Sequence, residues 1–211
     1  MGLGLSVLVA CISCDKKQGF TQEEVAVITA PAPEGRSDYE GKVLRVWKID
    51  KLSDSLLLRS VAQPVTEEMV WSEEYARLRE RMLVTVRDSL DEGVGIAAPQ
   101  VGISRQVIAV QRFDKEGEPF EFYLNPEILE RSDSTVLGME GCLSVPYAGG
   151  GNIYGKVARS AELKLRYRTE DFRDTVEVVK GFSAVIFQHE VDHLNGVLFV
   201  DRMVPGSETI Q

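Results

Sequence analysis

The two histidines of this chain stand four residues apart in the segment "QHEVDHLN" (Gln188–Asn195). In an α-helix, residues four apart project from one face, about 6 Å from each other, so a helical segment allows His189 and His193 to share one metal ion. Glu190 follows the first histidine directly, where it can reach a water at the same ion. The segment therefore predicts a helix, residues 182–196, that carries two metal ligands and a general base. A pair of structural histidines is the alternative interpretation.

A catalytic metal site needs a third protein ligand and an open coordination position. No histidine remains, and Cys11 and Cys14 lie near the amino end, which leaves Cys142 in "EGCLSVP" as the candidate. One thiolate and two neutral imidazoles leave a divalent ion with one net positive charge, which suits hydrolysis of a small carbonyl substrate. A packed core thiol is the alternative for Cys142.

A third segment, "GVGIAAPQVG" (93–102), is rich in small residues. It lacks the G-x-G-x-x-G pattern of a dinucleotide loop, and a predicted helix precedes it where a strand should stand. Small residues in a row permit close approach of another backbone, and Gln100 can donate an uncharged hydrogen bond to a developing oxyanion. A tight structural turn explains this segment equally well.

The remaining pattern predicts an α+β fold. A helix is expected from the N-cap Ser72 to Gly93, because its apolar residues recur every three or four positions. Strands are expected at 43–49, 105–113, 120–129, 161–169 and 175–182, with a glycine-rich loop at 146–156. Strands in meander order with separated helices favour antiparallel sheets over a parallel α/β sheet.

The chain is expected to divide into four parts. Residues 1–14 resemble a bacterial lipoprotein signal in which Cys11 carries the lipid, although no Lys or Arg precedes the apolar run. Residues 15–42 are interpreted as a tether or loosely packed extension, 43–205 as the catalytic domain and 206–211 as a tail. No apolar segment is long enough to span a bilayer as a helix, and the net charge of -9 argues against nucleic acid as a partner.

Taken together, "GVGIAAPQ", "EGCLS" and "QHEVDH" resemble, in order and spacing, the three signature motifs of peptide deformylase. Weaker similarity extends from about residue 43 to 203, and the first forty or so residues have no counterpart in the compact form of the family. The resemblance implies antiparallel sheets around a central metal-binding helix. It also implies hydrolysis of N-formylmethionyl peptides or nascent chains to formate and a free amine.

The resemblance further implies roles for single residues. Cys142, His189 and His193 become ligands of one divalent ion, Fe²⁺ by family expectation or Zn²⁺, and Glu190 becomes the acid/base. Gln100 and the backbone N–H of Leu143 would stabilise the oxyanion, while Glu140 would pair with Arg159. The family more often has proline where Ala158 stands. The residues implied to bind the substrate are Val94, Gly95, Phe182, Val185 and Ile186, with His189 beside them.

Two departures from the family pattern concern the substrate range. The glycine-rich segment 147–156 replaces a region that helps to hold the substrate, and Phe182 is bulkier than the usual residue, so it is expected to narrow the side-chain pocket. Two other functions stay open: a metallopeptidase that cuts ordinary amide bonds, and a formyl-peptide binder without catalysis. The protein is expected to be a bacterial monomer, exported and anchored by lipid, with a cytoplasmic location as the alternative.

Overall fold

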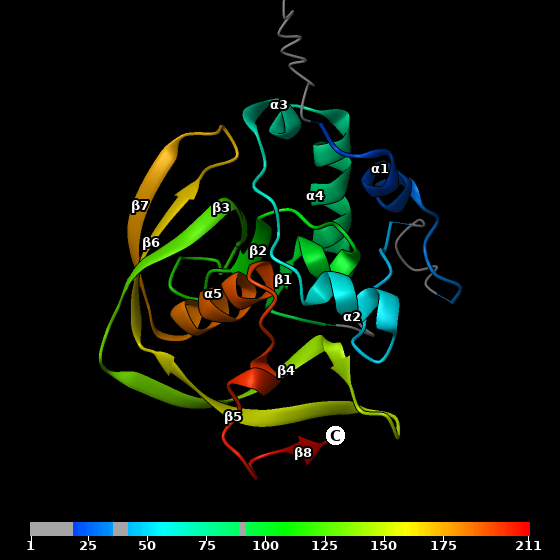
Figure 1. Ribbon diagram of the computed structural model, residues 1–211. Helices are drawn as coiled ribbons and strands as arrows, with labels where there is room; N and C mark the ends of the chain where they lie inside the picture. Colours follow the sequence, from blue (N-terminus) through cyan, green and yellow to red (C-terminus); the bar gives the residue numbers. More distant parts are fainter. Residues whose placement is uncertain (1–18, 36–41, 89–91) are drawn as a thin grey trace, which may run out of the picture.

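The computed structural model describes residues 19–35, 42–88 and 92–211. Within them, helix α5 (Gly181–Leu194) lies between two antiparallel sheets, as Figure 1 shows. One sheet has the strand order β1-β2-β3-β6-β7 and the other the order β4-β5-β8. The α+β class expected from the sequence is therefore confirmed.

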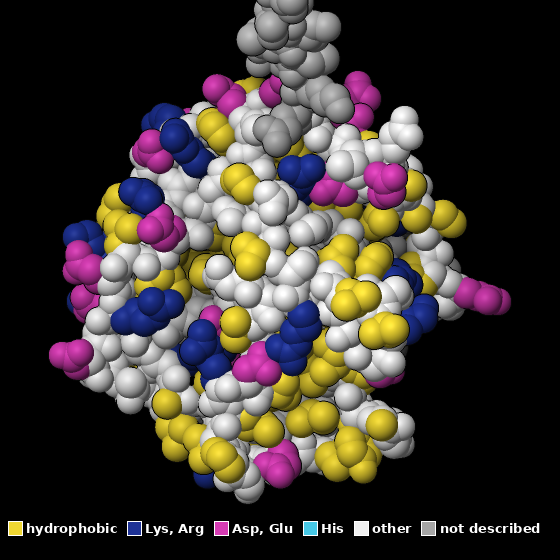
Figure 2. All heavy atoms as spheres, in the orientation of Figure 1, with side chains coloured by type: hydrophobic (Ala, Val, Ile, Leu, Met, Phe, Trp, Pro, Cys, Tyr) yellow, Lys and Arg dark blue, Asp and Glu magenta, His cyan; other side chains and the backbone are white. Residues whose placement is uncertain are grey.

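The larger sheet is formed by β1 (Gly95–Ala97), β2 (Val107–Gln111), β3 (Phe120–Arg131), β6 (Glu162–Arg168) and β7 (Asp174–Lys180). In β6, Leu163, Leu165 and Tyr167 are buried, as expected of a strand with one face in the core and one in water. The outer face carries ion pairs between neighbouring strands, such as Lys164 with Glu130 at 2.7 Å. Figure 2 shows charges of both signs interspersed over this side of the molecule.

The smaller sheet is formed by β4 (Thr135–Pro146), β5 (Asn152–Ser160) and β8 (Thr209–Ile210). Residues 206–211, expected as a tail, contain β8, whose Thr209 and Ile210 pair with Tyr154 and Ile153. The expected glycine-rich loop is also shorter than the sequence indicates, because β5 begins at Asn152. The sequence pattern did not reveal β4, which contains the "EGCLS" motif.

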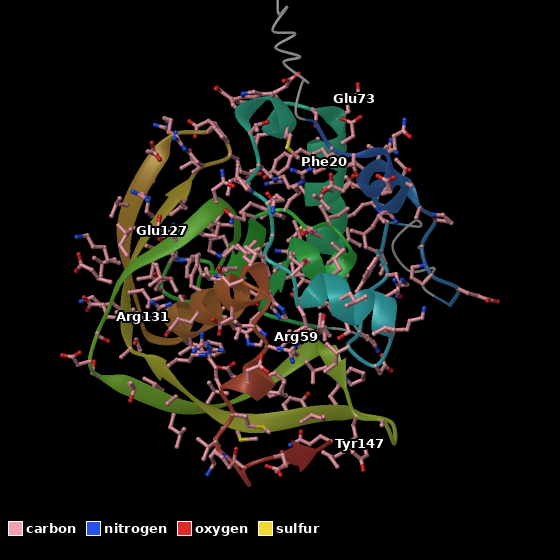
Figure 3. The ribbon with its side chains drawn as sticks, in the orientation of Figure 1. Phe20, Arg59, Glu73, Glu127, Arg131 and Tyr147 are labelled. Carbon is pink, nitrogen blue, oxygen red and sulfur yellow. The ribbon has the colours of Figure 1, made fainter. Side chains whose placement is uncertain are left out.

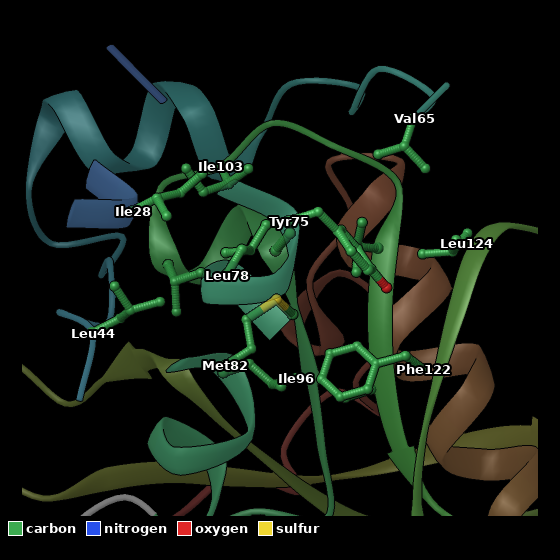
Figure 4. Packing of buried hydrophobic residues seen from close by; sticks show 14 of the residues in the cluster. Ile28, Leu44, Val65, Tyr75, Leu78, Met82, Ile96, Ile103, Phe122 and Leu124 are labelled. Carbon is green, nitrogen blue, oxygen red and sulfur yellow. The ribbon is translucent and has the colours of Figure 1, made fainter. Parts of the chain in front are cut away.

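The first part of the chain contributes helix α4 (Glu73–Val86) and three shorter helices, α1 (Gln22–Thr29), α2 (Leu52–Leu58) and α3 (Glu67–Val70). The side chain of Ser72 accepts a hydrogen bond from the N–H of Tyr75, which is the expected cap. The helix ends at Val86 rather than at Gly93, and Leu90 lies outside the described residues. Figure 4 shows how Tyr75, Leu78 and Met82 of α4 pack with residues of other elements in one apolar cluster.

Residues 19–35 form a docked segment rather than the expected tether. Ile28 of α1 has no exposed surface and lies in the same cluster as Leu78. Glu24 makes two hydrogen bonds to the guanidinium of Arg105, at 2.6 and 2.9 Å. Burial of an aliphatic side chain together with a shielded ion pair explains the docking. The expected lipoprotein signal, residues 1–14 with Cys11, lies outside the described residues.

Residues 43–49 do not form the expected strand, and their burial does not alternate, since the neighbours Val43 and Leu44 are both buried. Their backbone is extended, yet it bonds to two different elements instead of one neighbouring strand. The N–H of Trp47 donates to the carbonyl of Gln100 at 2.7 Å, and the N–H of Ile49 donates to the carbonyl of Ser144 at 3.0 Å. The segment therefore connects the short helix η1 (Ala98–Val101) to β4. No helix among the described residues is long and apolar enough to cross a membrane.

Candidate active site and metal centre

Three side chains from two elements converge at the centre of the molecule. His189 and His193 project from one face of α5, and Cys142 comes from β4. Their donor atoms all lie within 4.8 Å of one another, and the Sγ of Cys142 is 3.3 Å from the Nε2 of His193. Cys142 and His193 are buried and His189 is nearly so, which is the arrangement that one metal ion requires.

The register of the smaller sheet turns the side chain of Cys142 toward α5. The β4–β5 ladder pairs Gly141 with Tyr154 but resumes only at Pro146 and Asn152, so β4 carries extra residues between these pairs. Such a bulge re-aims side chains and frees backbone groups from the ladder. Cys142 and Leu143 lie in this irregular stretch, Cys142 toward α5. The structure thus places a strand residue where the sequence left the local structure of this motif unassigned.

Glu140 fixes the orientation of the His189 ring. Its Oε2 lies 2.9 Å from the Nδ1 of His189, and because a carboxylate only accepts, the ring donates from Nδ1 and turns Nε2 toward the other donors. Arg159 donates to both oxygens of Glu140, at 2.8 and 2.9 Å. Burial opposes ionisation of Glu140, but the hydrogen bonds from Arg159 and His189 outweigh it and lower its pKa to about 2. The expected pair of Glu140 and Arg159 is present despite Ala158 before it.

Asp192 and Arg202 extend this ion-pair network. Arg159 also donates to Asp192 at 2.5 Å, and Arg202 donates to both Asp192 oxygens at 2.6 and 2.7 Å. A chain of charges therefore runs from the partly exposed Arg202 through Arg159 to Glu140 and the ring of His189. Asp192 within "QHEVDH" needed a partner, but no spacing in the sequence indicated Arg202 as one.

Glu190 lies in the same site, and one of its carboxylate oxygens makes no hydrogen bond to a described residue. It is buried, and its Oε2 has no hydrogen-bond partner among the described residues. A Cβ on Gly95 would lie 2.5 Å from its Oε1, so only glycine lets β1 approach this closely. Burial raises the pKa of Glu190 to about 7. A carboxyl with such a pKa can both take and return a proton near neutral pH.

Gln100 presents its amide to the sulfur. Its Oε1 accepts from the N–H of Ala97 at 2.9 Å, which leaves Nε2 to point at the Sγ of Cys142, 3.5 Å away. The short helix η1 ends at Gly102, whose φ of 84° and contact with the Trp47 ring exclude a side chain. Gly95 and Gly102 of this segment thus serve close packing, and the amide of Gln100 lies beside the sulfur of Cys142.

A cavity of about 310 Å³ opens onto these groups. It is lined by the residues expected to bind the substrate, Val94, Gly95, Phe182, Val185 and Ile186, together with Leu143. Phe182 is 54% exposed and packs against Phe113 with ring centroids 5.1 Å apart, so its bulk lies at the mouth of the cavity. The structure adds lining residues that the sequence did not indicate, namely Glu92, Met139, Asn152 and Tyr154.

The glycine-rich turn lies at one end of this wall. The N–H of Tyr147 donates to the carbonyl of Gly151 at 3.0 Å, closing the turn before β5. Figure 3 shows Tyr147 close to β8. The Tyr154 ring lies over Gly141, where a Cβ would come within 2.5 Å of it. The turn and β8 therefore flank the strand that supplies Asn152 and Tyr154 to the cavity.

Comparison with known proteins identifies the family. The sequence model described as polypeptide deformylase matches residues 46–208. The chain belongs to the peptide deformylase family. The peptide deformylase of Thermotoga neapolitana is 40% identical over 154 residues, covering 73% of this chain and 85% of the relative. That of Leptospira biflexa serovar Patoc is 34% identical over 167 residues, covering 76% and 89%.

Solved peptide deformylases share the fold. The class I type b peptide deformylase of Acinetobacter baumannii, in a structure with bound actinonin, is 41% identical with a TM-score of 0.65, covering 77% of this chain and 99% of that one. The structure from Thermotoga maritima is 36% identical, with a TM-score of 0.65 and the same coverage. The resemblance found in the sequence is thus confirmed, and with it an enzyme of this family.

The donor set suits the divalent metal on which peptide deformylases depend. A soft thiolate and two imidazoles favour first-row ions such as Fe²⁺ and Zn²⁺ over Mg²⁺ or Ca²⁺. Burial lowers the pKa of His193 and so keeps this ligand neutral, the form that binds metal. Burial also acts to lower the pKa of His189, but hydrogen bonds to Cys142 and Glu140 raise it overall.

Proposed function

We propose that the chain hydrolyses the formyl group from the amino end of N-formylmethionyl peptides, with Cys142, His189 and His193 holding the metal. One observation carries this proposal. One cavity is lined by Cys142, His189, the amide of Gln100 and the buried carboxylate of Glu190, which has an open oxygen. The donor atom of His193 lies within 4.8 Å of those of Cys142 and His189. A formyl group is the smallest acyl group, and Gly95 and Glu190 leave little room beside the reacting carbon.

When bound, the divalent ion supplies Lewis-acid activation of water and of the formyl oxygen. Glu190 takes a proton from the attacking water through its open oxygen and returns it to the departing amine nitrogen. Gln100 Nε2 and the N–H of Leu143 donate to the formyl oxygen as it gains negative charge. The C–N bond breaks, and formate and a free amino terminus leave.

The cavity residues give the expected orientation of the peptide. The methionine side chain lies against Val94, Val185 and Ile186, while the backbone of Gly95 hydrogen-bonds the peptide backbone. Phe182 at the mouth contacts the residues that follow methionine. Because the exposed side chains of Phe182 and Glu92 both line the cavity, peptides with an apolar second residue should have a lower KM than those with an acidic one.

The test is a formate-release assay on the purified full chain, with metal content measured on the same sample. Release of formate from a formylated peptide, without cleavage of its acetylated or unblocked counterpart, supports the proposal. Cleavage of the unblocked peptide would instead indicate a metallopeptidase. Tight binding of the formylated peptide without formate release would indicate a binder without catalysis.

The variant Cys142→Ala tests the metal assignment. It removes one of three ligands and should reduce bound metal to less than about a tenth of the wild-type content. Leu137→Ala, on the same strand but 58% exposed, is the matched control and should keep its metal. Full metal occupancy in Cys142→Ala would refute this ligand set.

We also propose an exported, membrane-anchored form of the enzyme, lipidated at Cys11, that acts on released formyl peptides with Zn²⁺. The support is the apolar run before Cys11, with small residues around it. A cytoplasmic enzyme would act on nascent chains and use Fe²⁺, which oxidant outside the cell would attack. Mass spectrometry of the mature amino terminus and elemental analysis of protein from its native host distinguish the two.

A further inference from the structure

A second cavity lies behind the metal ligands, on another side of α5. Its volume is about 160 Å³, and it shares no lining residue with the cavity of the active site. Arg131, Thr135 and Arg202 are at its mouth, where their side chains reach solvent, and Arg159, Ser160 and Asp192 are deeper. Figure 3 labels Arg131 on the side of the molecule where β3 approaches α5. Three arginines around so small a space are unusual in a chain of net charge -9.

The arginines around this cavity have N–H donors that no described residue accepts. A guanidinium has five N–H groups. The side chain of Arg159 is only 3% exposed and directs three of its N–H groups to Glu140 and Asp192, which leaves two. Arg202 directs two to Asp192. Arg131 has no side-chain hydrogen bond or ion pair with any described residue. Several charged donors therefore surround one cavity.

The charges around this cavity do not cancel. Arg159 and Arg202 are balanced by Glu140 and Asp192, and Asp192 is the carboxylate that lines the cavity. Arg131 adds a positive charge that no described carboxylate pairs with. The outer face of the neighbouring sheet differs, since Arg166 pairs with Glu127 and Arg168 with Asp174. Arg131 also lines a neighbouring pocket with Glu127 and Arg166, and there too it makes no ion pair with a described residue.

We propose that this cavity, the arginine cavity, binds a small oxyanion such as inorganic phosphate or a carboxylate the size of formate. Its volume equals roughly five water molecules, which admits one such group with little space left. Planar guanidinium groups bind oxyanions through paired N–H donors, and the hydroxyls of Thr135 and Ser160 add further donors at the mouth and the wall.

The proposal links the arginine cavity to the metal site described above, and this link rests on the proposed ligands. An anion that engages Arg131, Arg159 and Arg202 together fixes the guanidinium of Arg159. Arg159 in turn fixes Glu140, which orients the ring of His189. A bound anion should therefore slow the loss of metal to a chelator.

The test is calorimetric titration of the metal-loaded full chain with phosphate and, separately, with formate, at constant ionic strength in chloride. Saturable binding is expected for at least one of the two, and the stronger of them identifies the source. Arg131→Gln should weaken that binding about tenfold or more, because one charge-assisted hydrogen bond is lost. Arg166→Gln, which removes an arginine outside this cavity, should bind as the wild type does.

Two outcomes would overturn the proposal. One is an absence of saturable binding by both anions in the wild type. The other is an equal affinity of the wild type and Arg131→Gln for the anion, which would indicate that the anion binds at the metal instead. Rates of metal loss to a chelator supply a second readout: the anion should slow this loss at least severalfold in the wild type and in Arg166→Gln, but not in Arg131→Gln. Formate release plays no part in either measurement, so these results are separate from the test of the enzyme.

Discussion

Helices α4 and α5 have the same length, fourteen residues, and are built on different principles. In α4 the buried stripe is mainly apolar and the opposite face is in water. In α5 most residues are buried, and the buried residues include the polar or charged side chains Gln188, Glu190, Asp192 and His193. The apolar stripe of α4 needs only a core to pack against. The polar groups of α5 need specific partners, and these come from distant parts of the chain. Helix α4 thus contributes stability through apolar packing, whereas the buried polar side chains of α5 form and support the candidate active site.

The sharpest test of this comparison is Glu190→Gln in α5. The variant keeps the shape of the side chain but removes the proton acceptor, so kcat should fall by about 10²–10⁴ while metal content and unfolding temperature change little. Glu92→Gln, which alters another carboxyl group lining the cavity, is the control and should retain kcat within a fewfold range. Wild-type turnover by Glu190→Gln would remove Glu190 from the mechanism.

The converse test is Leu78→Ala in α4. Leu78 has no exposed surface, so the truncation should lower the free energy of unfolding by about 2–5 kcal/mol. The kcat of the folded fraction should stay the same, because α4 supplies no group to the cavity. Urea denaturation and formate release measure the two quantities. Arg77→Ala, on the exposed face of α4, should cost less than about 0.5 kcal/mol, and an equal cost would contradict the packing argument.

The polar network around α5 should make the free energy of unfolding depend on pH in the acidic range. The pKa of Glu140 falls from 4.5 to about 2 on folding. Because folding lowers this pKa, the ionised carboxylate stabilises the folded state at pH values above the pKa of the unfolded chain. This contribution is lost as the pH falls from 4.5 toward 2. Glu140→Gln should therefore be less stable than the wild type by about 3 kcal/mol near pH 6, and the difference should shrink toward pH 2.

Urea unfolding of chelator-treated protein at several pH values measures this difference without the metal. The exposed Glu130→Gln is the control and should follow the wild-type curve. A difference between Glu140→Gln and the wild type that stays constant with pH would show that the ionised pair contributes nothing.

The smallest effect is expected at the cap of α4. The hydroxyl of Ser72 satisfies the N–H of Tyr75, and Ser72→Ala should cost about 1 kcal/mol of stability without any change in activity. Thermal unfolding measures the loss. An unchanged unfolding temperature would mean that water replaces the cap without cost.

Local signals in the sequence predict part of the fold. The cap at Ser72, the periodicity of α4 and the alternation of β6 depend only on neighbouring residues, and the structure confirms all three. The sequence of residues 43–49 alternates like that of a strand, but such a pattern does not determine the backbone partners, and the backbone here bonds to Gln100 and Ser144. The sequence did not predict helix α1, because its neighbours are rich in proline and charge. Burial of Ile28 and the ion pair of Glu24 with Arg105 hold this helix against the rest of the protein.

The candidate site divides in the same way. His189, Glu190 and His193 follow from helical spacing, and Cys142 follows as the remaining soft ligand. The tyrosine and asparagine from β5 that line the cavity, Tyr154 and Asn152, depend on the register of a bulged ladder, which no short pattern encodes. The same holds for Arg202, which reaches Asp192 only because η2 (Phe199–Asp201) turns the chain back beside α5.

The extended segment that joins Gln100 to Ser144 has a consequence for how this enzyme can change during evolution. Two peptide groups, those of Trp47 and Ile49, set the spacing between the amide donor and the strand that bears the sulfur. Insertion or deletion of one residue at Lys48 would turn one of these N–H groups to the opposite side. A substitution of the Lys48 side chain leaves both of these backbone hydrogen bonds in place, whereas a change in the length of the segment would disconnect two parts of the active site at once.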